Sequence, residues 1–106
     1  MAIIAVMAGT RRAVLLQYDE IYDEEGWRMV LKIWKVPKSR TSPDEIDYSL
    51  SLISPKGERL VGYDNHWPKE HHRHMLGQES PYSYRGTDRL IADFKADVIE
   101  ARRKRK

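Results

Sequence analysis

All four histidines of the chain fall between positions 66 and 74, a density of ionisable chemistry that no other stretch matches. They are His66, His71, His72 and His74, and acidic, amide, basic and aromatic side chains surround them. Histidine changes charge near neutral pH and is also a common metal ligand, so the cluster favours either proton transfer or metal binding. Residues 61–85 are therefore the first candidate site.

His72 and His74 form a His-x-His pair, and residues two apart on an extended strand point to the same side. Two imidazoles on one side can remove a proton from an RNA 2′-hydroxyl and return one to the leaving 5′-oxygen. Lys69 and Arg73 would then stabilise the charge that builds on the phosphate, and Asp64 would orient one imidazole. This hypothesis is ribonuclease-like chemistry by these five residues, with no metal and no cofactor.

Two alternatives stay open. A metal-dependent hydrolase could use nitrogen and oxygen ligands from Asp64, His66, His72 and His74. In the other alternative the histidines are hydrogen-bonded or solvated supports in a non-catalytic module that binds RNA or protein. Residue types alone do not choose among these interpretations.

Four segments have the pattern of strands that could position the site. Residues 11–21, 27–36 and 48–53 alternate apolar and polar side chains, and 58–65 follows a Ser-Pro-Lys-Gly sequence typical of a type I turn. Because these segments follow one another through turns and a polar loop, we predict an antiparallel meander. The predicted fold class is α+β, a four-stranded meander sheet with a C-terminal helix packed on one face.

The helix is predicted over residues 87–102. Leu90, Ile91, Phe94 and Val98 recur at spacings of three and four, the period of an amphipathic helix, and Thr87 is the expected N-cap. The basic run at the end, residues 102–106, is expected to fray into solvent.

Length and composition limit the class of protein. A chain of 106 residues predicts a single domain over 1–106, and the lack of cysteine excludes disulfides and thiolate sites. The net charge of +3 comes from the five-residue basic tail, since the other 14 basic residues face 16 acidic ones. Residues 1–10 predict an edge strand or an extension rather than a secretory signal or membrane span. A cytoplasmic location is expected.

Several short motifs occur in a familiar order. They are Tyr63-Asp64-Asn65, then Lys69, then His72-Arg73-His74, then Glu79-x-Pro81-Tyr82, and last a helix with Leu90, Asp93, Phe94, Asp97 and Val98. Over roughly residues 11–100 this order resembles the TumE family of small toxins from type II toxin–antitoxin pairs. Pro68 and Glu70 depart from that pattern, since glycines usually flank the lysine there.

The resemblance implies a growth-inhibiting toxin that a cognate helix-turn-helix antitoxin keeps silent, with RNA as the expected substrate and no membrane partner. A homodimer is left open. Besides the five catalytic candidates, the hypothesis assigns supporting or substrate-contacting roles to a second set of residues. These are Tyr63, Asn65, Glu79, Tyr82 and Arg85.

Overall fold

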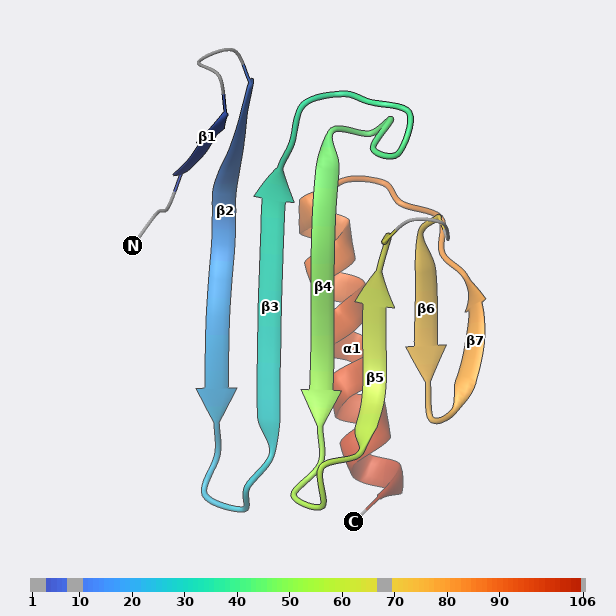
Figure 1. Cartoon of the computed structure of the whole chain (residues 1–106). Helices are drawn as coiled ribbons and strands as arrows, with labels where there is room; N and C mark the ends of the chain where they lie inside the picture. The colour runs from blue at the N-terminus through green and yellow to red at the C-terminus, as the bar shows by residue number, and fades with distance from the viewer. Residues whose placement is uncertain (1–3, 8–10, 67–69, 106) are drawn as a thin grey trace.

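Antiparallel strands in sequence order and one C-terminal helix make up the computed structural model, which describes residues 4–7, 11–66 and 70–105 (Figure 1). The elements are β1 Ile4–Met7, β2 Arg11–Tyr22, β3 Arg28–Lys35, β4 Ile46–Ile53, β5 Arg59–Asp64, β6 His72–Met75, β7 Gln78–Pro81 and α1 Thr87–Lys104. Each strand pairs with the next one along the chain, so the sheet is a pure meander. The predicted α+β class is confirmed.

The predicted number of strands was wrong. The four predicted strands correspond to β2–β5, but β6 and β7 extend the meander to six strands, and β1 adds a short edge strand beyond β2. Strands β6 and β7 have four residues each, too few for a period-two pattern to stand out. Strand β1 agrees with one of the two alternatives for residues 1–10.

Helix α1 crosses behind β4 and β5 and covers one face of the sheet (Figure 1). Alternation along each strand decides which side chains lie beneath it. Leu50 of β4 and Tyr63 of β5 are paired across the strands and both are buried, and the ring of Tyr63 packs edge-on against Phe94 of α1. The buried core consists of Leu31, Ile33, Ile46, Tyr48, Leu50, Leu52, Leu60, Val61, Tyr63, Leu90, Phe94, Val98 and Ala101. We call this side the helix face, and the opposite side the open face.

The start of α1 differs from the prediction that Thr87 is its N-cap. The N-cap is Gly86, which has a φ of 101° and no side-chain capping bond, and Thr87 is the first helical residue. The carbonyl oxygen of Gly86 accepts the first helical bond, from the Leu90 amide at 3.1 Å. Among the residues that the structure describes, no helix combines the length and apolarity that a bilayer crossing requires.

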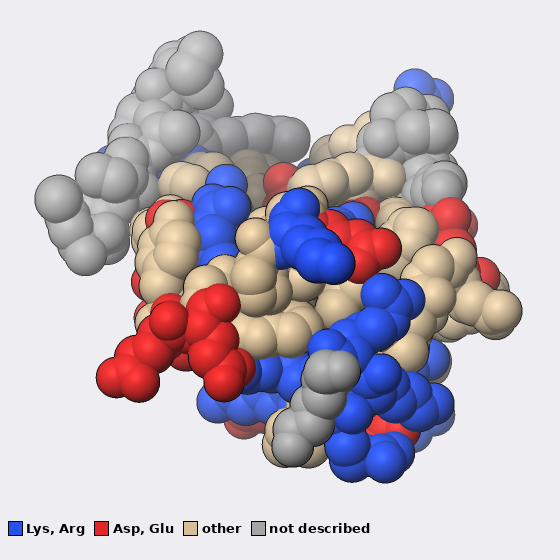
Figure 2. All heavy atoms as spheres, turned by 90° about the horizontal axis from the view of Figure 1, so that it is seen from below, with Lys and Arg blue, Asp and Glu red and all other residues tan. Residues whose placement is uncertain are grey.

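Within its described part, residues 102–105, the basic tail does not fray as predicted, because α1 continues to Lys104. Arg102 pairs with Asp23 at 2.8 Å and stacks over Trp27, while Arg105 pairs with Glu58 at 3.1 Å. The view from below shows Lys and Arg side chains gathered on one part of this surface, with Asp and Glu side chains close to them (Figure 2). The tail is therefore partly neutralised by the strand connections that it packs against.

Candidate functional site

The hairpin of β6 and β7 assembles the site. Its two-residue turn, Leu76-Gly77, has positive φ at both positions, 51° and 88°, as a type I′ turn requires. That turn fixes a register in which His74 faces Glu79, and pairing with β5 sets Asp64 opposite His72. Four ionisable side chains from three neighbouring strands therefore meet on the open face.

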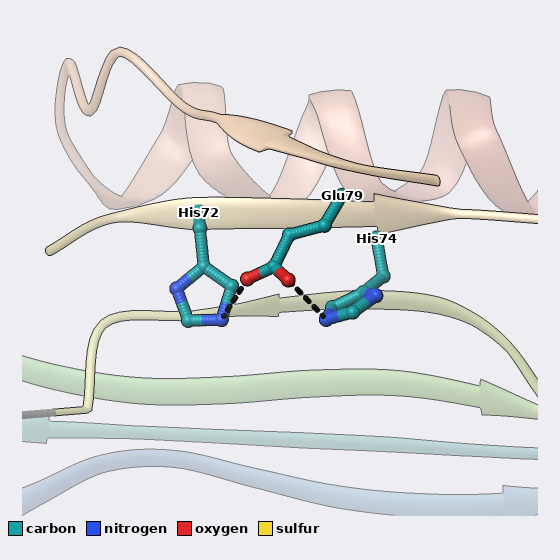
Figure 3. Close-up of side chains that lie close together, drawn as sticks. All are labelled: His72, His74 and Glu79. Carbon is teal, nitrogen blue, oxygen red and sulfur yellow. Dashed lines mark ion pairs between the residues drawn. The ribbon is translucent and has the colours of Figure 1, made fainter. Parts of the chain in front are cut away.

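The carboxylate of Glu79 lies between the two imidazole rings (Figure 3). Its oxygens are 3.5 Å from His72 Nε2 and 3.8 Å from His74 Nε2. The second carboxylate, that of Asp64, is closer to His72, at 2.8 Å from Nε2. We call Asp64, His72, His74 and Glu79 the open-face cluster.

His72 is held at both ring nitrogens. Its Nδ1 lies 2.9 Å from the carbonyl oxygen of Glu70, and its Nε2 faces the carboxylates of Asp64 and Glu79. Both ring nitrogens therefore have polar partners, which fix the orientation of the ring. The side chain of His74 is more exposed, 35% against 12% for His72, which leaves it accessible to a ligand.

The cluster also has the donors of a metal site. One ligand atom each from His72, His74 and Glu79 lies within 4.8 Å of the others. Two imidazoles and a carboxylate suit Zn²⁺ and similar ions, and the bond from His72 Nδ1 to a carbonyl is the outer contact that metal-binding histidines commonly make. His66, which the metal hypothesis included, lies elsewhere and pairs with Asp47 at 3.3 Å.

Arg73 lies away from this cluster, between His72 and His74 in sequence but on the helix face. Its Nε and Nη2 donate to the two carboxylate oxygens of Asp97, at 2.6 Å and 3.0 Å. The hydroxyl of Tyr63 donates to the same carboxylate at 2.6 Å. The Asp97 hydrogen bond raises the pKa of Arg73 above its usual value, and burial raises that of Tyr63. Arg73 therefore fastens α1 to the sheet.

Of the other supporting residues, Tyr82 and Asn65 also stabilise the fold. Tyr82 packs edge-on against Tyr63, and its hydroxyl donates to Asp93 of α1 at 2.6 Å. The side chain of Asn65 bridges back to β4, accepting from the Tyr48 amide at 3.0 Å and donating to the Ile46 carbonyl at 2.8 Å. Arg85 is exposed beside a polar hollow on the helix face.

Lys69, placed on the phosphate by the sequence hypothesis, lies outside the described residues, as does Pro68. His71 is described and is a packing residue. Its ring stacks on Tyr84 with centroids 4.8 Å apart, and its nitrogens contact the Tyr48 hydroxyl at 2.9 Å and Asp44 at 2.6 Å. The four histidines thus divide into two in the cluster and two outside it.

Sequence reasoning missed a cation beside the cluster. Arg59 of β5 donates to Ser51 Oγ at 3.0 Å and to Asp64 Oδ2 at 3.4 Å, so its guanidinium lies on the open face. The i, i+5 spacing of Arg59 and Asp64 could have indicated this cation. It can be interpreted only once the pairing of β4 with β5 is known.

The bond between Tyr82 and Asp93 predicts a pH dependence of stability. This hydrogen bond is the main cause that lowers the pKa of Asp93 in the folded protein. Its contribution is therefore fully present above the unfolded pKa of about 4 and is lost as pH falls through the lower folded pKa. We expect Asp93→Asn to reduce the free energy of unfolding by about 1 kcal/mol at pH 6, and by less at pH 3. Urea unfolding at both pH values measures this; an equal deficit at both would contradict it.

The fold and the site together define a small α+β protein with a histidine–carboxylate cluster on the exposed face of an antiparallel meander. In a comparison with family models, the model described as Toxin TumE matches residues 14–103. The chain belongs to the TumE toxin family. No curated protein and no solved structure matches it significantly.

Proposed function

We propose that this protein, a member of a toxin family, arrests growth by cleaving RNA with metal-independent acid and base chemistry at the open-face cluster. The observation that carries the proposal is the placement of His72, His74 and Glu79 around one accessible spot, with Asp64 orienting His72. Side chains that exchange protons near neutral pH are what a 2′-hydroxyl attack on the neighbouring phosphate needs.

The roles follow from the surroundings of each imidazole. His72, with acceptors at both nitrogens, donates the proton to the leaving 5′-oxygen, and Asp64 holds its ring in place. His74, which is more exposed, takes the proton from the 2′-hydroxyl, with Glu79 supporting it. The 2′-oxygen then bonds to phosphorus as the bond to the 5′-oxygen breaks, which yields a 2′,3′-cyclic phosphate and a 5′-hydroxyl.

Induced expression in bacteria tests the role of the cluster in toxicity. The wild type should arrest growth, and His74→Ala should relieve the arrest at an equal level of soluble protein. His71→Phe, which keeps the stack on Tyr84, is the matched control outside the cluster and should remain toxic at the same level of soluble protein. Full arrest by His74→Ala would rule out the proposed base.

A second candidate function is a metal-dependent hydrolase, because His72, His74 and Glu79 bring three ligand atoms within 4.8 Å. Elemental analysis of protein purified without an affinity tag separates the two. Stoichiometric zinc, with activity lost on chelation and restored by the metal, would favour this candidate; full activity in EDTA would favour proton transfer.

Membership of a toxin family suggests an antitoxin partner. We propose that this partner is a helix-turn-helix protein encoded beside the toxin, and that both act in the cytoplasm, where the RNA substrate is. Co-purification with the product of the adjacent gene tests the pairing, and size-exclusion chromatography of the free toxin tests for a homodimer.

A further inference from the structure

We propose that Arg59 binds the phosphate of the substrate at the open-face cluster, and that residue 62 is a glycine because a side chain there would displace the Arg59 guanidinium. The inference rests on the proposed action on RNA and adds a residue that the family motifs do not contain. It answers a question that the position of Arg73 raises, namely which cation neutralises the phosphate.

The Arg59 guanidinium packs directly against the backbone of β5 at Gly62. A Cβ atom built on Gly62 would lie 2.2 Å from Arg59 Cζ and 2.3 Å from Nη2. The guanidinium therefore occupies the space that a side chain of residue 62 would fill. Gly62 has no φ value in the left-handed region, so backbone conformation does not explain the glycine here, whereas a side chain at this position would displace the Arg59 guanidinium.

The position of the guanidinium over Gly62 lies next to His74, the proposed general base. Gly62 and His74 are direct partners across β5 and β6, and side chains at such positions are roughly 5 Å apart at Cβ. The guanidinium that fills the place above Gly62 is thus the cross-strand neighbour of the His74 imidazole. A phosphate that contacts Arg59 would bring the adjoining 2′-hydroxyl towards His74.

Arg59 has donors left for a ligand. Nε donates to Ser51 and Nη2 to Asp64, while Nη1 has no hydrogen-bond partner among the residues that the structure describes. The side chain is 37% exposed. Two existing bonds hold the planar fork in place, so little conformational freedom is lost when a phosphate oxygen binds.

The charge of the cluster makes such a cation necessary. Asp64 and Glu79 are both carboxylates, and they would repel a phosphodiester that approached His72 and His74. Arg59 offsets the nearer of them through its contact with Asp64 at 3.4 Å. By contrast, Arg73 lies on the helix face, where its guanidinium already donates to both carboxylate oxygens of Asp97.

Binding of a short single-stranded 2′-O-methyl RNA tests the proposal, since this probe lacks the attacking hydroxyl and is not cleaved. We expect Arg59→Ala to weaken binding about tenfold at low salt, and to lower the slope of log affinity against log salt by about one phosphate contact. Arg28→Ala is the matched control. Arg28 is also on the open face and 38% exposed, but it lies on β3, two strands away from β5, and pairs with Glu20 of β2.

Gly62→Ala provides a second variant that keeps the arginine but displaces its guanidinium, and it should weaken binding in the same direction. Thermal unfolding confirms that each variant is folded. If both variants bind RNA as the wild type does, the proposal for Arg59 is overturned while action on RNA stands. If the wild type neither binds nor cleaves RNA, the proposed function fails and this inference fails with it.

Discussion

Replacement of His72 by alanine is expected to lower the rate of RNA cleavage by roughly 10²- to 10⁴-fold, the usual contribution of one general acid. The ring of His72 contacts both carboxylates of the open-face cluster and the carbonyl of Glu70. Its loss would remove the proposed proton donor and the imidazole that contacts both Asp64 and Glu79. Gel analysis of a defined RNA under single-turnover conditions measures this rate.

His66→Ala is the control for that experiment. His66 pairs with Asp47 outside the cluster, and its side chain is 58% exposed, so its removal should change neither cleavage nor stability noticeably. If both variants lost activity equally, or if His72→Ala cleaved RNA at the rate of the wild type, the assignment of the acid would be wrong.

Asp97→Ala is expected to lower the free energy of unfolding by about 3 kcal/mol, because it leaves a partly buried arginine and a tyrosine hydroxyl without their shared acceptor. The Asp97 side chain is 14% exposed, so water replaces its bonds only in part. Tyr63→Phe removes one of the bonds and should cost about 1 kcal/mol. Urea unfolding followed by circular dichroism measures both values.

Lys95→Ala, an exposed position on the same helix, controls for a general effect on α1 and should change stability little. The Asp97 variant also tests whether Arg73 stabilises the packing of α1 rather than taking part in cleavage. If Arg73 fastens the helix, the variant should be less stable but should cleave RNA normally per folded molecule at low temperature. Unchanged stability would contradict the fastening role.

The long elements could be predicted because their patterns extend over many residues. Strand β3 alternates over eight residues, and α1 repeats its apolar positions through Leu90, Phe94 and Val98. Strands β6 and β7 could not, since each has four residues and Leu76-Gly77 lacks the asparagine or aspartate that usually marks such a turn. The N-cap was also missed, because Gly86 provides no side chain that signals a helix start.

The alternation of side chains along a strand explains both the correct and the incorrect predictions at the site. Alternation along a strand correctly placed His72 and His74 on one side, with rings 5.8 Å apart. Applied to Arg73 it would have placed that residue on the other side, yet the hypothesis grouped all three by proximity in sequence. Arg59 needed information that alternation does not contain, namely the pairing of Gly62 with His74 across β5 and β6.

The chemistry of the RNA ends tests the central claim most directly. The wild-type protein is incubated in EDTA with an RNA of known sequence, and the products are examined by mass spectrometry. Proton transfer at the open-face cluster predicts cleavage in EDTA, with 2′,3′-cyclic phosphate and 5′-hydroxyl ends that are absent for His72→Ala. Intact RNA in EDTA, or cleavage only with added metal to give 5′-phosphate ends, would contradict the account.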